Sequence, residues 1–175
     1  IDGKPLKSNR WMRIDGVLPG VENVYEDVSG SVRLEVLSGI SASLIRVVII
    51  NTDSNPHQFT LRCDSGWPSE NPAWVDATIN AGDNIQAGWN ERADRVLILG
   101  IGADAYSLQA DGLPPGSRNM ILVWNMKQGE KRQGWIVRPY QSYAADLPVL
   151  RKHDWAKEME QGRKEWHELL GQASQ

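Results

Sequence analysis

The sequence predicts a mainly β protein, an antiparallel β-sandwich followed by one long C-terminal amphipathic α-helix. Short segments in which apolar and polar residues alternate recur roughly every 8–12 residues, with turn residues and no helical pattern between them. The final segment, residues 154–170, instead carries apolar residues at helical spacing. We therefore assign residues 1–145 to a β-sandwich domain and residues 146–175 to a linker helix.

The strands are expected from residue 31 onward, because residues 1–30 are punctuated by Pro and Gly and are predicted to form loops. Residues 32–36 alternate cleanly, as a half-buried strand does. Residues 44–50 are largely apolar on both faces, which is typical of a central strand. A short polar turn leads to the alternating residues 58–63, and it leaves no room for a crossover, so we expect an antiparallel hairpin here. Further strands are predicted at residues 75–79, 84–89, 95–100, 106–110, 119–124 and 133–137.

The C-terminal helix has one apolar stripe, made of Trp155, Met159, Gly162, Trp166 and Leu170. Burying each Trp ring is worth roughly 2–3 kcal/mol, so two such rings require a partner surface. We expect the helix to lie along the outer face of the sandwich and to bury Trp155. Trp166 would remain partly available, and Trp155, Trp166 and Leu170 are our candidates for interdomain contact.

Composition and charge exclude several classes of protein. The net charge is −3 and no long Lys/Arg run occurs, so a nucleic-acid partner is not expected. No apolar run approaches the roughly 18 residues of a membrane span, so no membrane partner is expected either. The single cysteine, Cys63, excludes an intrachain disulfide and is expected to be buried. A first residue other than Met fits a proteolytic fragment or a mature protein, and a periplasmic or secreted location is expected.

The residues that carry catalysis do not form a recognisable constellation in this sequence. The three histidines are scattered, and none belongs to an H-E-x-x-H or i, i+4 pair. No G-x-S-x-G motif occurs, and residues 100–102 lack the pattern of a dinucleotide-binding loop. We therefore predict no catalytic residue, metal or cofactor in this chain, and no catalysis by the chain alone.

The aromatic composition points to binding, since the chain has eight Trp and four Tyr against one Phe. Trp67 and Trp74 flank a loop that contains two prolines, and Trp89 follows. Indole faces stack on the apolar faces of sugar rings, and the nearby Glu70 and Asn71 could bond hydroxyl groups. These five residues are the candidate carbohydrate-binding site, for a glycan or oligosaccharide. The alternative is that the Trp rings fill gaps between the sheets or support the helix.

One stretch of the sequence resembles a known family. An Arg-Pro-Tyr strand end at residues 138–140 is followed by a helix that closes on Trp166, two residues, and then Leu169-Leu170. Together with the strands at residues 93–100, 120–124 and 134–137, this is similar to the N-terminal β-sandwich and linker helix of the six-hairpin, or (α/α)6-barrel, glycoside hydrolases. The strand at residues 46–51 is similar to the opening of the same sandwiches.

The resemblance implies a non-catalytic accessory domain, because the catalytic carboxylates of that family belong to the helical barrel that follows the linker. The partner it implies is a helical catalytic domain, in the same or a partner chain. A stand-alone carbohydrate-binding module is the alternative, and an assembly module whose terminal helix docks on a partner is a third. The coding sequence after residue 175 discriminates between them, because only the first requires a long helical region there.

Overall fold

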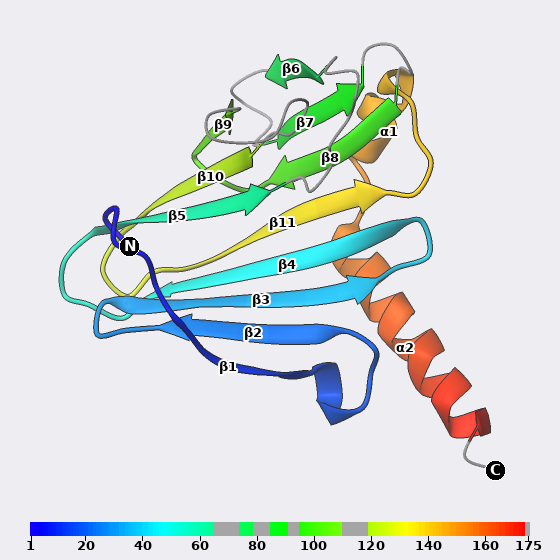
Figure 1. The fold of residues 1–175 in the computed structure, drawn as a ribbon, viewed down its shortest axis with the longest axis horizontal. Coiled ribbons are helices and arrows are strands. Elements are labelled where there is room, and N and C mark those ends of the chain that lie inside the picture. The colour runs from blue at the N-terminus through cyan, green and yellow to red at the C-terminus, as the bar shows by residue number, and fades with distance from the viewer. Residues whose placement is uncertain (65–73, 79–84, 91–94, 110–118, 174–175) are drawn as a thin grey trace.

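The computed structural model describes residues 1–64, 74–78, 85–90, 95–109 and 119–173. Within them it confirms the predicted fold class, with two antiparallel sheets and one long C-terminal helix (Figure 1). The described part of the larger sheet has eight strands, in the order β1-β2-β3-β4-β11-β8-β7-β6. Their bounds are Ser8–Arg13, Val21–Glu26, Gly30–Ser38, Ala42–Asn51, Lys131–Pro139, Arg95–Ile101, Ile85–Asn90 and Trp74–Thr78, in the same order.

The smaller sheet has the order β5-β10-β9 among the described residues. Strand β10 (Asn119–Met126) lies between β5 (His57–Asp64) and β9 (Ala105–Gln109). Figure 1 shows β1 and β2 extending beyond the smaller sheet on one side. The larger sheet is therefore covered by the smaller one over only part of its width.

An apolar core lies between the two sheets. Alternate residues of β4, such as Val47 and Ile49, meet Phe59, Leu122 and Trp124 of the smaller sheet, and all five are at most 2% exposed. The opposite face of the larger sheet carries a second apolar cluster, which includes Leu37 and Leu44. Strand β4 thus carries apolar residues on both faces because both of its faces are covered.

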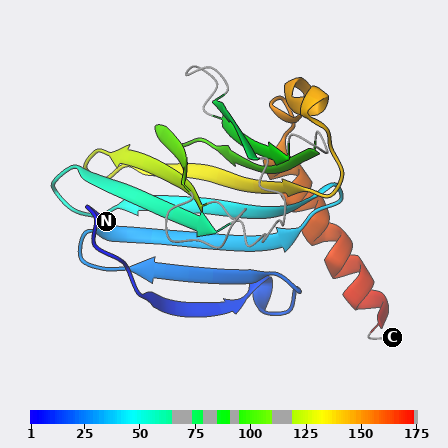
Figure 2. The same cartoon turned by 45° about the horizontal axis from the view of Figure 1, so that its top comes forward.

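Helix α2 (Trp155–Ala173) packs on this second face through its first turns, as predicted. It follows a short 3-10 turn, η2 (Ala144–Asp146), and a single helical turn, α1 (Leu147–Leu150). Figures 1 and 2 show α2 running past one end of the strands, with its C-terminal end pointing away from the sheets. No helix in the described part of the chain is long and apolar enough to cross a membrane.

The predicted hairpin of residues 44–50 and 58–63 is wrong. Strand β4 pairs with β3 and β11, whereas β5 pairs with β10 in the other sheet. The turn between them crosses from one sheet to the other, and it is held by Asn51, which is fully buried. The Asn51 amide donates to the carbonyls of Asn55 and Lys127, at 2.8 and 3.1 Å, and its oxygen accepts from the Asp53 backbone. These bonds replace the cross-strand ladder that a hairpin would need.

Two other predictions are corrected. Residues 1–30 contain strands β1 and β2, together with the 3-10 turn η1 (Ile14–Gly16). Every residue of β1 is exposed, so this edge strand shows no apolar alternation from which it could be recognised. Cys63 is half-buried against the core between the sheets, not fully buried.

Candidate functional site

The predicted carbohydrate site falls largely outside the described residues. Trp67, Glu70 and Asn71 lie in the stretch 65–73, which the structure does not describe. Trp74 begins β6 and Trp89 lies in β7, and the register pairs Trp74 with Asn90 and Val75 with Trp89. The two tryptophans therefore occupy adjacent rungs of one strand pair. The carbohydrate site as a whole stays a prediction.

The interdomain candidates lie on α2, which begins with a capped and firmly packed turn. The Asp154 carboxylate accepts a hydrogen bond from the Lys157 backbone at 2.9 Å, the N-cap contact that its position predicts. Trp155 is 4% exposed and Met159 is fully buried in the cluster that contains Leu37 and Leu44. The Trp155 indole nitrogen has no hydrogen-bond partner among the described residues, so packing alone holds the ring.

A buried carboxylate ties the same part of α2 to the turn between β3 and β4. Glu158, only 7% exposed, accepts hydrogen bonds from the backbone and the hydroxyl of Ser41 at 2.9 Å each. Its second oxygen lies 2.8 Å from the same hydroxyl and 2.6 Å from Nε2 of His153. Charge-assisted bonds of this kind satisfy a carboxylate that would otherwise be costly to bury.

The helix approaches this turn so closely that two glycines are required. A Cβ at Gly162 would lie 3.2 Å from the carbonyl oxygen of Ser38. A Cβ at Gly39 would lie 2.6 Å from the Glu158 carboxylate. Gly162 of the predicted apolar stripe is therefore a site of close backbone approach, not a gap in the stripe.

One turn further along, an ion-pair group connects α2 to the face of the sheet. Glu35 of β3, 2% exposed, accepts from Arg46 of β4 at 2.5 Å and from Arg163 of α2 at 2.8 Å. Two guanidinium groups, from β4 and α2, thus bond to one buried carboxylate, and a third, from Arg33 of β3, lies 3.9 Å from it. Removing one partner of such a group is expected to leave an uncompensated buried charge.

The last turns of α2 have few contacts with the sandwich. Trp166 is only partly buried, and His167 faces Asp15 of η1 at 3.3 Å in an exposed contact. Leu169 and Leu170 are 54% and 39% exposed. As predicted, the helix buries Trp155 and leaves Trp166 partly available, whereas Leu170 faces solvent. The role of these residues in contact with another domain stays a prediction.

The polar groups that fix α2 on the sandwich were not predicted from the sequence. Glu35 occupies an outward position in an alternating strand, and Glu158 lies beside the apolar stripe of the helix, so both resemble solvated residues. A weak signal existed for Glu158, since it lies between Trp155 and Met159 on the same side of the helix. No such signal exists for Glu35, because its two partners are distant in sequence.

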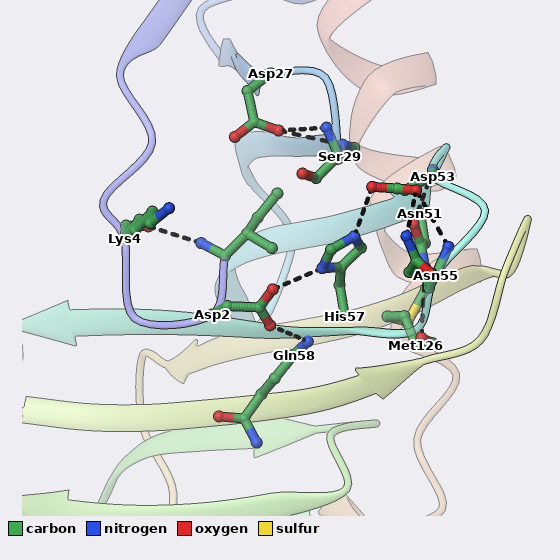
Figure 3. A network of polar contacts seen from close by, with 12 residues as sticks. Asp2, Lys4, Asp27, Ser29, Asn51, Asp53, Asn55, His57, Gln58 and Met126 are labelled. Atoms are coloured by element: carbon green, nitrogen blue, oxygen red, sulfur yellow. Dashed lines mark hydrogen bonds and ion pairs between the residues drawn. The ribbon is translucent and has the colours of Figure 1, made fainter.

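A second polar network, also missed, holds the N-terminal segment (residues 1–7) at the far end of the sandwich (Figure 3). His57 lies between two carboxylates, with Nδ1 2.6 Å from Asp2 and Nε2 2.9 Å from Asp53. A neutral imidazole has a single N–H, so only the protonated ring donates to both. These hydrogen bonds, to Asp53 first and then to Asp2, raise the pKa of His57, and the same contact lowers the pKa of Asp53 to about 2.

Asp2 completes this attachment through the backbone of β5. The Gln58 N–H donates to the Asp2 carboxylate at 2.8 Å (Figure 3). The Asp2 N–H donates to the Gln58 carbonyl at 2.9 Å. The hydrogen bond from the Gln58 N–H, and then the one from His57, lower the pKa of Asp2. We call the contact of His57 with Asp2 and Asp53 the His57 bridge. Among the described residues, no group of three or more His, Cys, Asp or Glu side chains is arranged so that it could hold a metal ion.

The chain has a structural match but no sequence match among known proteins. No family model matches the sequence, and no curated protein matches it. Among solved structures, the chain is similar to a putative kojibiose phosphorylase from human microbiome, with 9% sequence identity and a TM-score of 0.38. The match covers 94% of this chain and 26% of that one, so this chain spans about a quarter of its length.

Proposed function

We propose that the chain is an accessory β-sandwich domain, non-catalytic by itself, that supports a helical catalytic domain of a glycoside hydrolase. In this proposal α2 is the linker, and residues 1–145 form the supporting domain. The proposal combines the sandwich-then-helix fold with the resemblance of residues 134–170 to the linker region of that family. The helical domain would lie in the same chain or in a partner chain.

The observation that carries the proposal is the unequal burial of α2. Its first turns are fixed by Trp155, Glu158 and Met159, while Trp166, Leu169 and Leu170 continue the same side of the helix with their surfaces uncovered or only partly covered. Isolated helices of this length are marginal in water, so the buried half stabilises the exposed half. A rigid helix that carries an uncovered apolar end is suited to receive a second domain.

The coding sequence after residue 175, followed by stability measurements, tests this proposal. We expect it to encode a long helical region, and the longer protein to hydrolyse an α-linked oligosaccharide that the present chain leaves unchanged. Trp166→Ala together with Leu170→Ala should destabilise the longer protein more than the present chain. A stop codon directly after residue 175, with no helical partner protein that binds the chain, would contradict the proposal.

A stand-alone carbohydrate-binding module is the alternative, and the excess of tryptophan over phenylalanine in the sequence is the observation that favours it. Intrinsic tryptophan fluorescence, titrated with a panel of soluble glycans, measures this directly. Binding that is lost in Trp74→Ala and Trp89→Ala, with the fold intact, would favour the binding module. Loss of stability without loss of binding would assign these rings to structural packing.

A further inference from the structure

The larger sheet is open on its inner face at β1 and β2, because the smaller sheet covers only part of its width (Figure 2). Trp11 of β1 pairs with Asn23 of β2, and Asn23 pairs with Leu34 of β3. Directly opposite residues of antiparallel strands have their side chains on one face, and Leu34 packs against the core between the sheets. Trp11 therefore lies on the inner face, and it is 70% exposed.

Polar side chains lie beside this exposed indole. Tyr25 is two residues from Asn23 along β2, and Arg13 is two residues from Trp11 along β1, so the four side chains share the inner face. Asn23 and Tyr25 are half-buried, and their side chains and that of Arg13 have no hydrogen-bond or ion-pair partner in the part of the chain that the structure describes. We call Trp11, Arg13, Asn23 and Tyr25 the Trp11 face. It combines an apolar ring with polar groups that can bond to a ligand.

The outer face of the same two strands is different. Arg10 and Met12 lie there, and Glu22 lies 3.9 Å from Arg10 and 3.9 Å from Arg33 of the next strand. The charges of the outer face therefore meet opposite charges within the sheet. On the inner face, no described residue satisfies the polar groups beside the exposed ring.

The charges of β1 disfavour a second copy of the chain as the occupant of this face. Lys7, Arg10 and Arg13 place three cations on or beside the edge strand, and two such strands side by side would bring like charges together. A neutral sugar ring meets no such repulsion. Its apolar side stacks on an indole, and its hydroxyls bond to amide, phenol and guanidinium groups. The inner face is also hollowed beside this group, where Tyr25 and Leu34 line a cavity of about 360 Å³.

We propose that the Trp11 face binds a ring of a neutral oligosaccharide. The indole of Trp11 stacks on the apolar side of the ring, and the side chains of Arg13, Asn23 and Tyr25 bond to its hydroxyls. This site is distinct from the predicted carbohydrate site of residues 67–89. The inference does not rest on the proposed accessory role, which the coding sequence after residue 175 tests separately.

Titration of the chain with maltotriose and with cellotriose, an α-linked and a β-linked trisaccharide, tests the proposal by NMR. We expect saturable binding of at least one of them, with the largest shifts at the Trp11 indole and the Asn23 side-chain amide. Trp11→Ala should weaken binding about tenfold or more, and Trp11→Tyr, which keeps a flat ring, should weaken it less. The matched control is Met12→Ala, which changes a 39% exposed residue on the opposite face of the same strand and should leave binding unchanged.

The Trp11 variants should fold, because the side chain that they change is exposed, and their urea midpoints should equal that of the unmodified chain. Four results would each overturn the proposal. They are no saturable binding of either trisaccharide, equal effects of Trp11→Ala and Met12→Ala, binding that is lost in Trp74→Ala but kept in Trp11→Ala, and self-association without sugar binding that Trp11→Ala abolishes.

Discussion

The two ends of the chain are attached to the sandwich in different ways. The C-terminal helix is held by buried groups, since Trp155, Glu158 and the Glu35 that Arg163 meets are each at most 7% exposed. The N-terminal segment is held by Asp2, whose side chain is 50% exposed, and by His57. The first attachment combines apolar burial with shielded charge, whereas the second is a polar contact near solvent.

This difference has consequences for stability. Loss of apolar contact or of a buried charge partner costs several kcal/mol, but exposed ion pairs contribute little and are sensitive to conditions. The helix should therefore behave as part of the folding unit. The N-terminal segment should respond to pH without unfolding the domain.

The largest effect is expected from Trp155→Ala, which should lower the free energy of unfolding by about 3 kcal/mol or more, because it leaves a cavity beneath the helix. Trp155→Phe should cost much less, since the indole nitrogen has no hydrogen-bond partner among the described residues. Urea denaturation measures both variants, with the exposed Leu169→Ala as a control. A loss at Trp155 no larger than that at Leu169 would show that the helix is not docked.

Glu158→Ala is expected to cost about 2–3 kcal/mol, because it removes a charged acceptor and leaves the Ser41 groups without their partner. Glu168→Ala, which changes an exposed carboxylate of the same helix, should change stability by less than about 0.5 kcal/mol. The same denaturation experiment compares them. Similar losses in the free energy of unfolding for the two variants would show that the buried Glu158 carboxylate does not help to dock the helix.

The pH dependence of the His57 bridge should be smaller than either of these effects. Because the pKa of His57 is raised, its contribution is fully present below the ordinary value of 6.5 and is lost as pH rises through the raised value. The pKa of Asp53 is lowered, so its contribution is present above the ordinary value of 3.8 and is lost as pH falls toward about 2.

Stability measured against pH checks this expectation. The difference in the free energy of unfolding between the unmodified chain and His57→Gln should be largest between pH 3.8 and pH 6.5, and it should shrink above neutral pH. His167→Gln, which changes the exposed contact with Asp15, is the control. A difference that grows with pH above neutrality would contradict the assigned protonation.

The sequence predicted the fold well where the spacing of apolar residues reflects which side chains are buried. The alternation of β3, the apolar run of β4 and the stripe of α2 each reflect which faces meet a core. Prediction from the sequence failed where the hydrogen-bond partners of a residue come from distant parts of the chain. The fully buried Asn51 turns the chain from one sheet to the other, and nothing in the short polar turn distinguishes such a crossover from a hairpin.

The two buried glutamates beside α2 were not predicted for the same physical reason, since their partners are distant in sequence. Glu35 and Glu158 are buried only because Arg46, Arg163 and Ser41 come from other elements to satisfy them. A charged residue between apolar ones is ordinarily solvated, so the sequence pattern predicted that both glutamates would face solvent. The exposed strand β1 was missed for the opposite reason, because an edge strand without a buried face has no alternation.

The smallest effect is expected from Trp166→Ala in the present chain. Its ring is only partly buried, so the loss should be about 1 kcal/mol or less, well below that of Trp155→Ala. Thermal denaturation of both variants gives this ranking. Equal losses at the two positions would mean that the sandwich holds the whole helix, and that no end of it is left for a partner.

Hydrogen exchange along α2, followed by mass spectrometry, tests most directly the central claim that the helix is docked by its first half only. In the present chain, the amides after the first turn up to residue 163 should be strongly protected, and those of residues 167–173 should exchange much faster. Addition of the helical catalytic domain, in the same chain or as a partner, should extend the protection to Leu170. Uniform protection along α2 in the present chain, or no change on adding that domain, would contradict the claim.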